Sequence, residues 1–186
     1  MKFENAKKYG FVLEPRYYYF GWSKIPEIVG RPSVLKALAK GRKMLPQGFN
    51  FKIWDLQRPR YVQLAMLASF ERRFKSQHPK WSKVRVWQEV FKFGAKPLPK
   101  VIRLDTHRNG GAVDLTIVDK NALELYMGTD HDDLTDRAAT NYYENLKRPR
   151  IMDTEARNNR RLLIKVMTAI KFENYAPEWW HWSYDK

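Results

Sequence analysis

The chain is organised around the stretch at residues 105–117, DTHRNGGAVDLTI. From Ala112 onward, apolar residues alternate with Asp114 and Thr116, which is the period of a β-strand. The two glycines before this strand permit a sharp turn that could bring His107 back beside Asp114. The stretch therefore predicts half of a metal site, carried on a sheet.

A second stretch, EWWH at residues 178–181, again places a carboxylate and an imidazole three positions apart. A catalytic zinc takes three protein ligands and keeps one position for water, whose pKa it lowers toward neutrality. The chain has no Cys and 4 His, so a histidine-based site must draw on this small set. We expect one Zn²⁺ per chain, bound by His107, Asp114 and His181. Glu178 is then placed to accept the proton of the water.

The order of these residues resembles the VanX-type D-alanyl-D-alanine dipeptidases, zinc peptidases related to the D,D-carboxypeptidases of peptidoglycan metabolism. The family pattern is Ser-x-His-x-x-Gly-x-Ala-x-Asp, followed much later by Glu-x-Trp-His. The matching residues are His107, Gly110, Ala112, Asp114, Glu178, Trp180 and His181. Asp105 stands where the family usually has Ser, and with Trp180 it is an expected substrate-binding residue.

A third motif, DLQRP at residues 55–59, follows an expected strand at 49–56 and matches the family's Asp-x-x-Arg-Pro. A guanidinium at a strand end can reach into an active site and stabilise charge on a scissile carbonyl oxygen. The resemblance gives this role to Arg58. Without the resemblance, an Arg that merely pairs with Asp55 is an equally good interpretation.

A fourth motif, MGTDHD at residues 127–132, matches the family's Met-Gly-Ser/Thr-x-Phe-Asp. In the family the final Asp holds the free ammonium of the dipeptide, so the resemblance assigns this contact to Asp132 and favours a dipeptidase. His131 replaces the family's Phe. We expect this pocket wall to be wetter or differently shaped.

Length and composition predict one domain spanning residues 1–186, because 44% hydrophobic residues suffice for a core. The resemblance implies that this is a zinc D,D-dipeptidase-like catalytic domain. The expected fold is α+β, with a small, mainly antiparallel sheet flanked by helices and the zinc site on the sheet. Helices are expected at 33–45, after Pro59, at 82–93 and at 153–171, with Ser33 and Asp153 as N-caps, and a short strand at 122–126.

The charge balance is strongly basic, with 35 Lys and Arg against 20 Asp and Glu, or a net charge of +15. Such a surface attracts nucleic acid, anionic lipid or acidic cell-wall polymers. The basic residues are scattered, so we expect a mainly solvated surface whose contact with anionic polymers, if any, is weak. The denser stretches are 40–43, 72–75, 80–85 and 157–165.

The N-terminus lacks the uninterrupted apolar run of a signal peptide, since charges fall at Lys2, Glu4, Lys7 and Lys8. The chain as written is therefore expected to be cytoplasmic, or periplasmic if a leader has been removed. Elsewhere, the sequence has no apolar stretch long enough to span a membrane.

The reaction expected from these residues is zinc-dependent hydrolysis of D-alanyl-D-alanine or a close D,D-dipeptide, as in peptidoglycan metabolism. Two alternatives stay open. One is a D,D-carboxypeptidase that acts on peptidoglycan peptides. The other, outside the enzymes, is a basic polyanion-binding module with a non-catalytic metal site.

Overall fold

The computed structural model of the protein describes residues 2–96 and 106–184, and its centre is a five-stranded sheet. In sheet order the strands are β2 (Val12–Leu13), β4 (Asn50–Asp55), β5 (Ala112–Val118), β7 (His181–Ser183) and β6 (Glu173–Asn174). β2 pairs in parallel with β4, and the three remaining pairs are antiparallel. The predicted α+β class with a small, mostly antiparallel sheet is confirmed. The assignment of all 186 residues to one catalytic domain stays a prediction.

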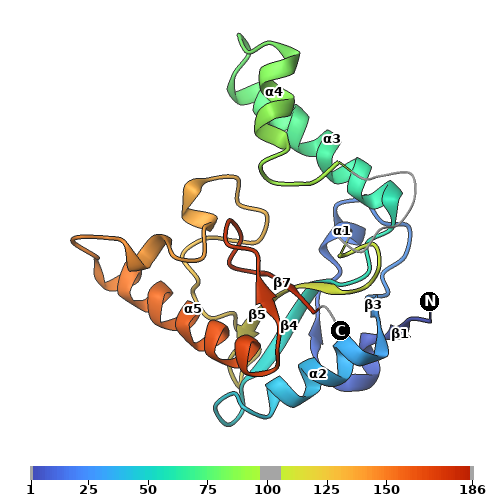
Figure 1. Ribbon diagram of the computed structural model, residues 1–186, viewed down its shortest axis with the longest axis vertical. Coiled ribbons are helices and arrows are strands. Elements are labelled where there is room, and N and C mark those ends of the chain that lie inside the picture. The colour runs from blue at the N-terminus through green and yellow to red at the C-terminus, as the bar shows by residue number, and fades with distance from the viewer. Residues whose placement is uncertain (1, 97–105, 185–186) are drawn as a thin grey trace.

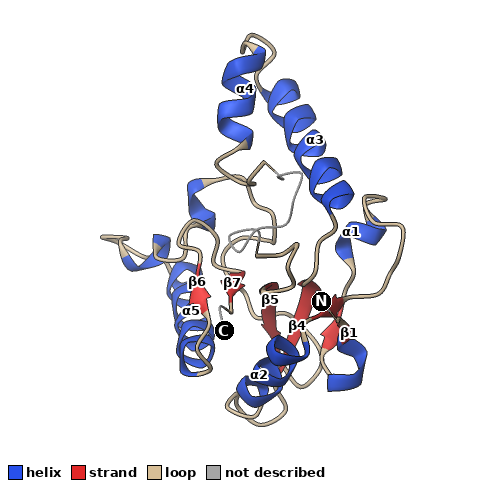
Figure 2. Ribbon diagram, turned by 45° about the vertical axis from the view of Figure 1, so that its right-hand side comes forward, coloured by secondary structure: helices blue, strands red, loops and turns tan. Residues whose placement is uncertain are grey.

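Helices pack around this sheet, and Figure 2 shows the strands between α2 and the α3–α4 pair. The helices are α1 (Arg16–Tyr19), α2 (Pro32–Arg42), α3 (Arg60–Gln77), α4 (Lys83–Val90) and α5 (Ile151–Ala169). The shorter elements are β1 (Glu4–Asn5) paired with β3 (Val29–Gly30), and the 3₁₀ turns η1 (Ala6–Tyr9), η2 (Asp136–Ala138) and η3 (Tyr142–Glu144). Within residues 2–96 and 106–184, none of these helices combines the length and apolar character needed to cross a membrane.

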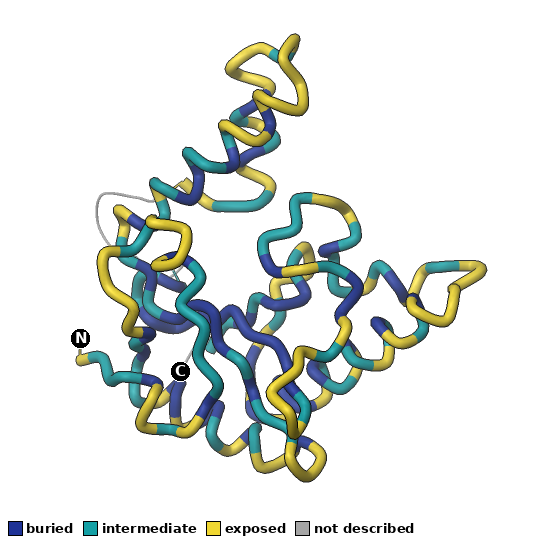
Figure 3. Tube along the Cα trace, turned by 180° about the vertical axis from the view of Figure 1, so that it is seen from behind, coloured by how far each residue is buried: buried dark blue, intermediate teal, exposed yellow. Residues whose placement is uncertain are grey.

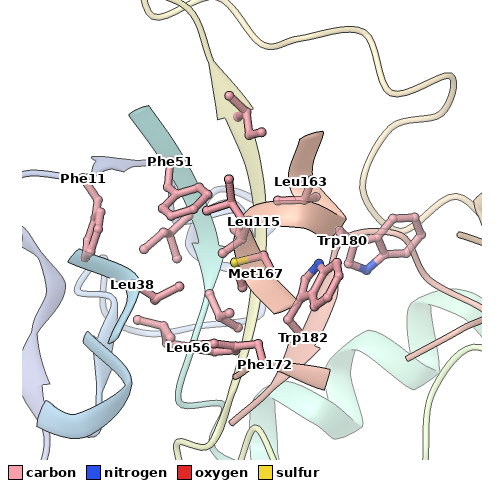
Figure 4. Close-up of a cluster of buried hydrophobic side chains, with 14 of the residues drawn as sticks. Phe11, Leu38, Phe51, Leu56, Leu115, Leu163, Met167, Phe172, Trp180 and Trp182 are labelled. Atoms are coloured by element: carbon pink, nitrogen blue, oxygen red, sulfur yellow. The ribbon is translucent and has the colours of Figure 1, made fainter. Parts of the chain in front are cut away.

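β5 is the central strand, and all seven of its residues are buried. Val113, Leu115 and Ile117 belong to the main hydrophobic core, which Figure 4 shows between β4, β5 and α5. Alternate residues of a strand point to opposite faces, so Asp114 and Thr116 face away from that core. They are nevertheless buried, because other segments cover the second face. The sheet thus presents a carboxylate in a site shielded from water.

The α3–α4 hairpin stands away from the sheet (Figure 1), and much of its far end is exposed (Figure 3). We call this hairpin, residues 60–96, the arm. Its inner face has a small hydrophobic cluster of its own, which includes Met66, Phe70, Phe74 and Val90. α3 begins directly after Pro59, whose φ of −61° suits the start of a helix. The arm is therefore a packed unit, and its base lies beside the end of β4.

Both predicted N-caps and one predicted strand are wrong. α2 begins at Pro32, because a proline preset for the first helical position starts the helix before Ser33 can cap it. α5 begins at Ile151, and Asp153 serves as its third residue, where its carboxylate accepts the N–H of Arg150. The strand expected at 122–126 is only an isolated bridge between Val118 and Glu124.

Candidate metal centre

Three segments bring His107, Asp114 and His181 together. Gly110, with φ of 72°, closes the turn that follows His107, and the chain then enters β5. Across the sheet, the β5–β7 register sets Asp114 directly opposite His181. His107 Nε2 lies 3.2 Å from Asp114 Oδ1 and 3.1 Å from His181 Nδ1. His181 Nδ1 lies 3.1 Å from Asp114 Oδ1, so the three atoms form a nearly equilateral triangle that could hold a metal ion.

This triangle fits a tetrahedral zinc. Ligand atoms bound at about 2.0–2.1 Å in a tetrahedron lie about 3.3 Å apart, which is close to the three observed distances. In the neutral ring, His107 Nδ1 donates a hydrogen bond to the carbonyl of Leu56 at 2.7 Å, and the Nε2 lone pair then faces Asp114 and His181. The donor set, its spacing and the His107 tautomer therefore all suit a divalent metal.

Arg58 holds the other side of the Asp114 carboxylate. Its Nη2 donates to Asp114 Oδ2 at 2.7 Å, and its Nε donates to Asp55 Oδ2 at 2.7 Å. Asp55 is also opposite Asp114 in the β4–β5 register. The pairing with Asp55 that the motif alone suggested is thus present. The same guanidinium also orients the candidate metal ligand.

Glu178 lies in the turn before β7, and one of its carboxylate oxygens is 3.8 Å from His181 Nδ1. Burial raises the pKa of Glu178, the nearby Asp114 and Asp132 raise it further, and the result is about 8. A divalent cation bound beside it would counteract this rise. Glu178 is therefore a carboxylate whose proton affinity suits acid–base chemistry near neutral pH.

A cavity of about 470 Å³ joins these groups, a size typical of small-ligand sites. Among the residues that line it are Arg58, His107, Asp114, Asp132, Glu178 and His181. Met66, Phe93 and Lys96 of the arm form part of its wall. Trp180 instead lies in the hydrophobic core, and Asp105 falls outside the described residues.

The segment at 127–139 brings Asp132 to the cavity. Asp132 has a left-handed backbone with φ of 58°, and burial raises its pKa. The neighbouring His131 has a fully buried side chain that stacks on Trp54 at 4.7 Å between ring centroids. The expectation of a wetter wall is therefore wrong. This part of the pocket is closed by aromatic packing.

Arg160 of α5 is a residue whose role sequence reasoning missed. It is 2% exposed, and its guanidinium donates to the carbonyls of Met127 at 2.8 Å, Arg137 at 2.9 Å and Ala139 at 2.6 Å. It thus fixes the segment that bears His131 and Asp132. A run of arginines on a basic helix gives no local signal that one of them is buried.

A candidate metal centre that shares a cavity with a buried carboxylate is of the kind found in metallopeptidases, and the comparisons with known proteins agree with that class. A peptidase M15 family model described as D-ala-D-ala dipeptidase matches residues 25–186. The chain is 28% identical over 167 residues to a D-alanyl-D-alanine dipeptidase of Synechocystis. The aligned region covers 82% of this chain and 68% of the relative. For the enzyme so named in Streptomyces coelicolor the identity is 30%, over 84% of this chain and 73% of the relative.

A protein of Enterococcus faecalis with the same name is 26% identical, over 86% of this chain and 75% of the relative. The chain therefore belongs to the D-Ala-D-Ala dipeptidase family of M15 hydrolases. The resemblance drawn from the sequence motifs is confirmed.

Proposed function

We propose that the protein hydrolyses D-alanyl-D-alanine or a close D,D-dipeptide, with one Zn²⁺ bound by His107, Asp114 and His181. The observation that carries the proposal is the triangle of ligand atoms at 3.1–3.2 Å, which shares a cavity with Glu178 and Arg58. The names of the relatives support the choice of substrate.

Each residue of the site has a distinct task in this reaction. Zinc, when bound, supplies a Lewis acid that polarises the scissile carbonyl and lowers the pKa of water. Glu178 accepts the proton of the attacking water and later passes it to the leaving amine. Arg58 stabilises the negative charge that develops on the carbonyl oxygen, and its contacts with Asp55 and Asp114 hold the guanidinium ready for this task.

Asp132 recognises the free ammonium of the dipeptide in this proposal. Its Oδ2 is buried and has no hydrogen-bond partner among the described residues. A buried carboxylate oxygen without a partner is costly, and a substrate ammonium would supply the missing donor. Asp105 and Trp180 stay proposed substrate-binding residues. The Trp180 ring would act indirectly, through its edge contact with His131 at 5.5 Å.

One assay separates the proposal from its alternatives. The release of D-alanine is measured from D-alanyl-D-alanine and from a peptidoglycan pentapeptide, with added zinc and after treatment with a chelator. We expect zinc-dependent cleavage of the dipeptide. Cleavage of the pentapeptide alone would instead support a D,D-carboxypeptidase, and zinc binding without any hydrolysis would support a non-catalytic module.

We also propose a weak contact with anionic polymers at the end of the arm. The basic stretches at 72–75 and 80–85 meet there, because α3 ends at Gln77 and α4 begins at Lys83. Six of their Lys and Arg side chains are exposed, namely Arg72, Arg73, Lys75, Lys80, Lys83 and Arg85. Such a cluster binds phosphate or carboxylate groups by charge alone, so the contact is sensitive to salt.

A further inference from the structure

His131 occupies a closed position between the candidate metal centre and Asp132. Its side chain is 0% exposed. The imidazole stacks on Trp54 at 4.7 Å, lies 5.9 Å from the Tyr17 ring and meets Trp180 edge-on at 5.5 Å. Three aromatic rings therefore fix its orientation, and the position of its Nε2 follows from that packing.

The Nε2 atom of His131 faces two carboxylates. Nε2 lies 3.6 Å from Asp114 Oδ2 and 3.5 Å from Asp132 Oδ1. Both distances are slightly too long for a hydrogen bond, and neither ring nitrogen of His131 has a hydrogen-bond partner among the described residues. A buried N–H without an acceptor is destabilising, and a movement of a few tenths of an ångström would satisfy it. Because Nε2 faces both carboxylates, it is the nitrogen that carries a proton in the neutral ring.

The surroundings of Asp114 favour Asp132 as the acceptor. Asp114 Oδ2 already accepts a charged hydrogen bond from Arg58 at 2.7 Å, and Asp114 Oδ1 faces the two candidate histidine ligands. Asp132 has the neutral Tyr17 hydroxyl as a neighbour but no cation that pairs with it directly, and its Oδ2 is buried without a hydrogen bond in the described part of the chain. Its left-handed backbone also needs support from neighbouring groups.

We propose that His131 is a positioning residue for substrate recognition. Its Nε2–H donates to Asp132 Oδ1 and thereby holds the carboxylate so that Oδ2 remains available to the ammonium of the dipeptide. This inference rests on the proposed dipeptidase function and deepens it. A Phe at this position would keep the aromatic packing but would have no N–H to donate, so this polar link depends on the histidine.

The test is His131→Phe, which preserves the ring and removes the donor. We expect the Michaelis constant for D-alanyl-D-alanine to rise about tenfold, as for the loss of one hydrogen bond to a charged group, while turnover changes less than about twofold. The Michaelis constant for N-acetyl-D-alanyl-D-alanine should stay the same, because this substrate lacks the ammonium. The zinc content should also stay the same. His78→Phe is the matched control, because His78 is exposed on the arm and stacks on Trp81.

A double-mutant cycle with Asp132→Asn supplies the decisive readout. In the Asp132→Asn background, His131→Phe should cause no further rise in the Michaelis constant for the free dipeptide. Equal effects on the free and acetylated substrates, additive effects in the cycle, or an unchanged or lower Michaelis constant would each overturn the inference.

Failure of the proposed function is recognised separately, as a zinc-loaded wild-type protein that cleaves neither substrate. In that case crystal structures of the wild type and His131→Phe decide the role of His131. The inference requires the Asp132 carboxylate to be turned by the substitution, and an identical carboxylate orientation in both structures would refute it.

Discussion

Replacement of Arg160 by Met tests whether α5 holds in place the segment that bears His131 and the proposed substrate-binding residue Asp132. Met keeps much of the length and apolar volume of the side chain and removes the guanidinium. Two backbone carbonyls, those of Met127 and Arg137, then lose the donor that Arg160 supplies, while the carbonyl of Ala139 keeps the N–H of Tyr142 at 3.0 Å. The contacts of the guanidinium with the rings of Tyr143 at 4.7 Å and Trp179 at 5.6 Å are lost as well.

The magnitude follows from these contacts. A buried carbonyl left without a partner costs about 1–3 kcal/mol. The sum for the two carbonyls is reduced because the variant no longer buries a charge. Burial of that charge lowers the pKa of Arg160 to about 10. We therefore expect Arg160→Met to lower the free energy of unfolding by about 2–4 kcal/mol, or the melting temperature by roughly 5–15 °C for a chain of this size.

The assay is urea unfolding, with the slope m compared between variants to confirm that the same surface unfolds. Arg161→Met is the matched control, because Arg161 is the next residue of the same helix, is 56% exposed and pairs with Glu144 at the surface. The control should lose less than about 1 kcal/mol. Equal losses in the two variants, or a loss below about 1 kcal/mol for Arg160→Met, would refute the reasoning.

Three further predictions concern the site and the surface. His181→Ala should bind clearly less zinc while keeping its fold, as measured by metal analysis and circular dichroism, and full occupancy would exclude His181 as a ligand. Glu178→Gln should bind zinc but lose at least about a hundredfold in turnover, and near-normal turnover would mean that another base serves. Binding of polyphosphate should weaken steeply with added salt while dipeptide cleavage changes little, and a parallel loss of both would link the basic surface to catalysis.

The sequence alone determined the chemistry of the candidate site. The spacing of His107 and Asp114 around a glycine turn, and of Glu178 and His181 near the C-terminus, predicted the residues of both halves of the candidate metal centre. The strand periodicity from Ala112 predicted β5, and the family resemblance that these motifs carry was confirmed. These features were accessible because each depends on residues close together in the chain, where turn and strand geometry limit the possible arrangements.

The tertiary structure decided how these parts meet. The β5–β7 register sets Asp114 opposite His181, and a shift of one residue would turn one of them to the other face of the sheet. Packing against Trp54 placed His131 between two carboxylates, and the fold buried Arg160 while it left Arg161 at the surface. Neighbouring residues of the same type look alike in a sequence. Their environments differ because contacts between distant segments, which local patterns do not encode, determine burial and hydrogen bonding.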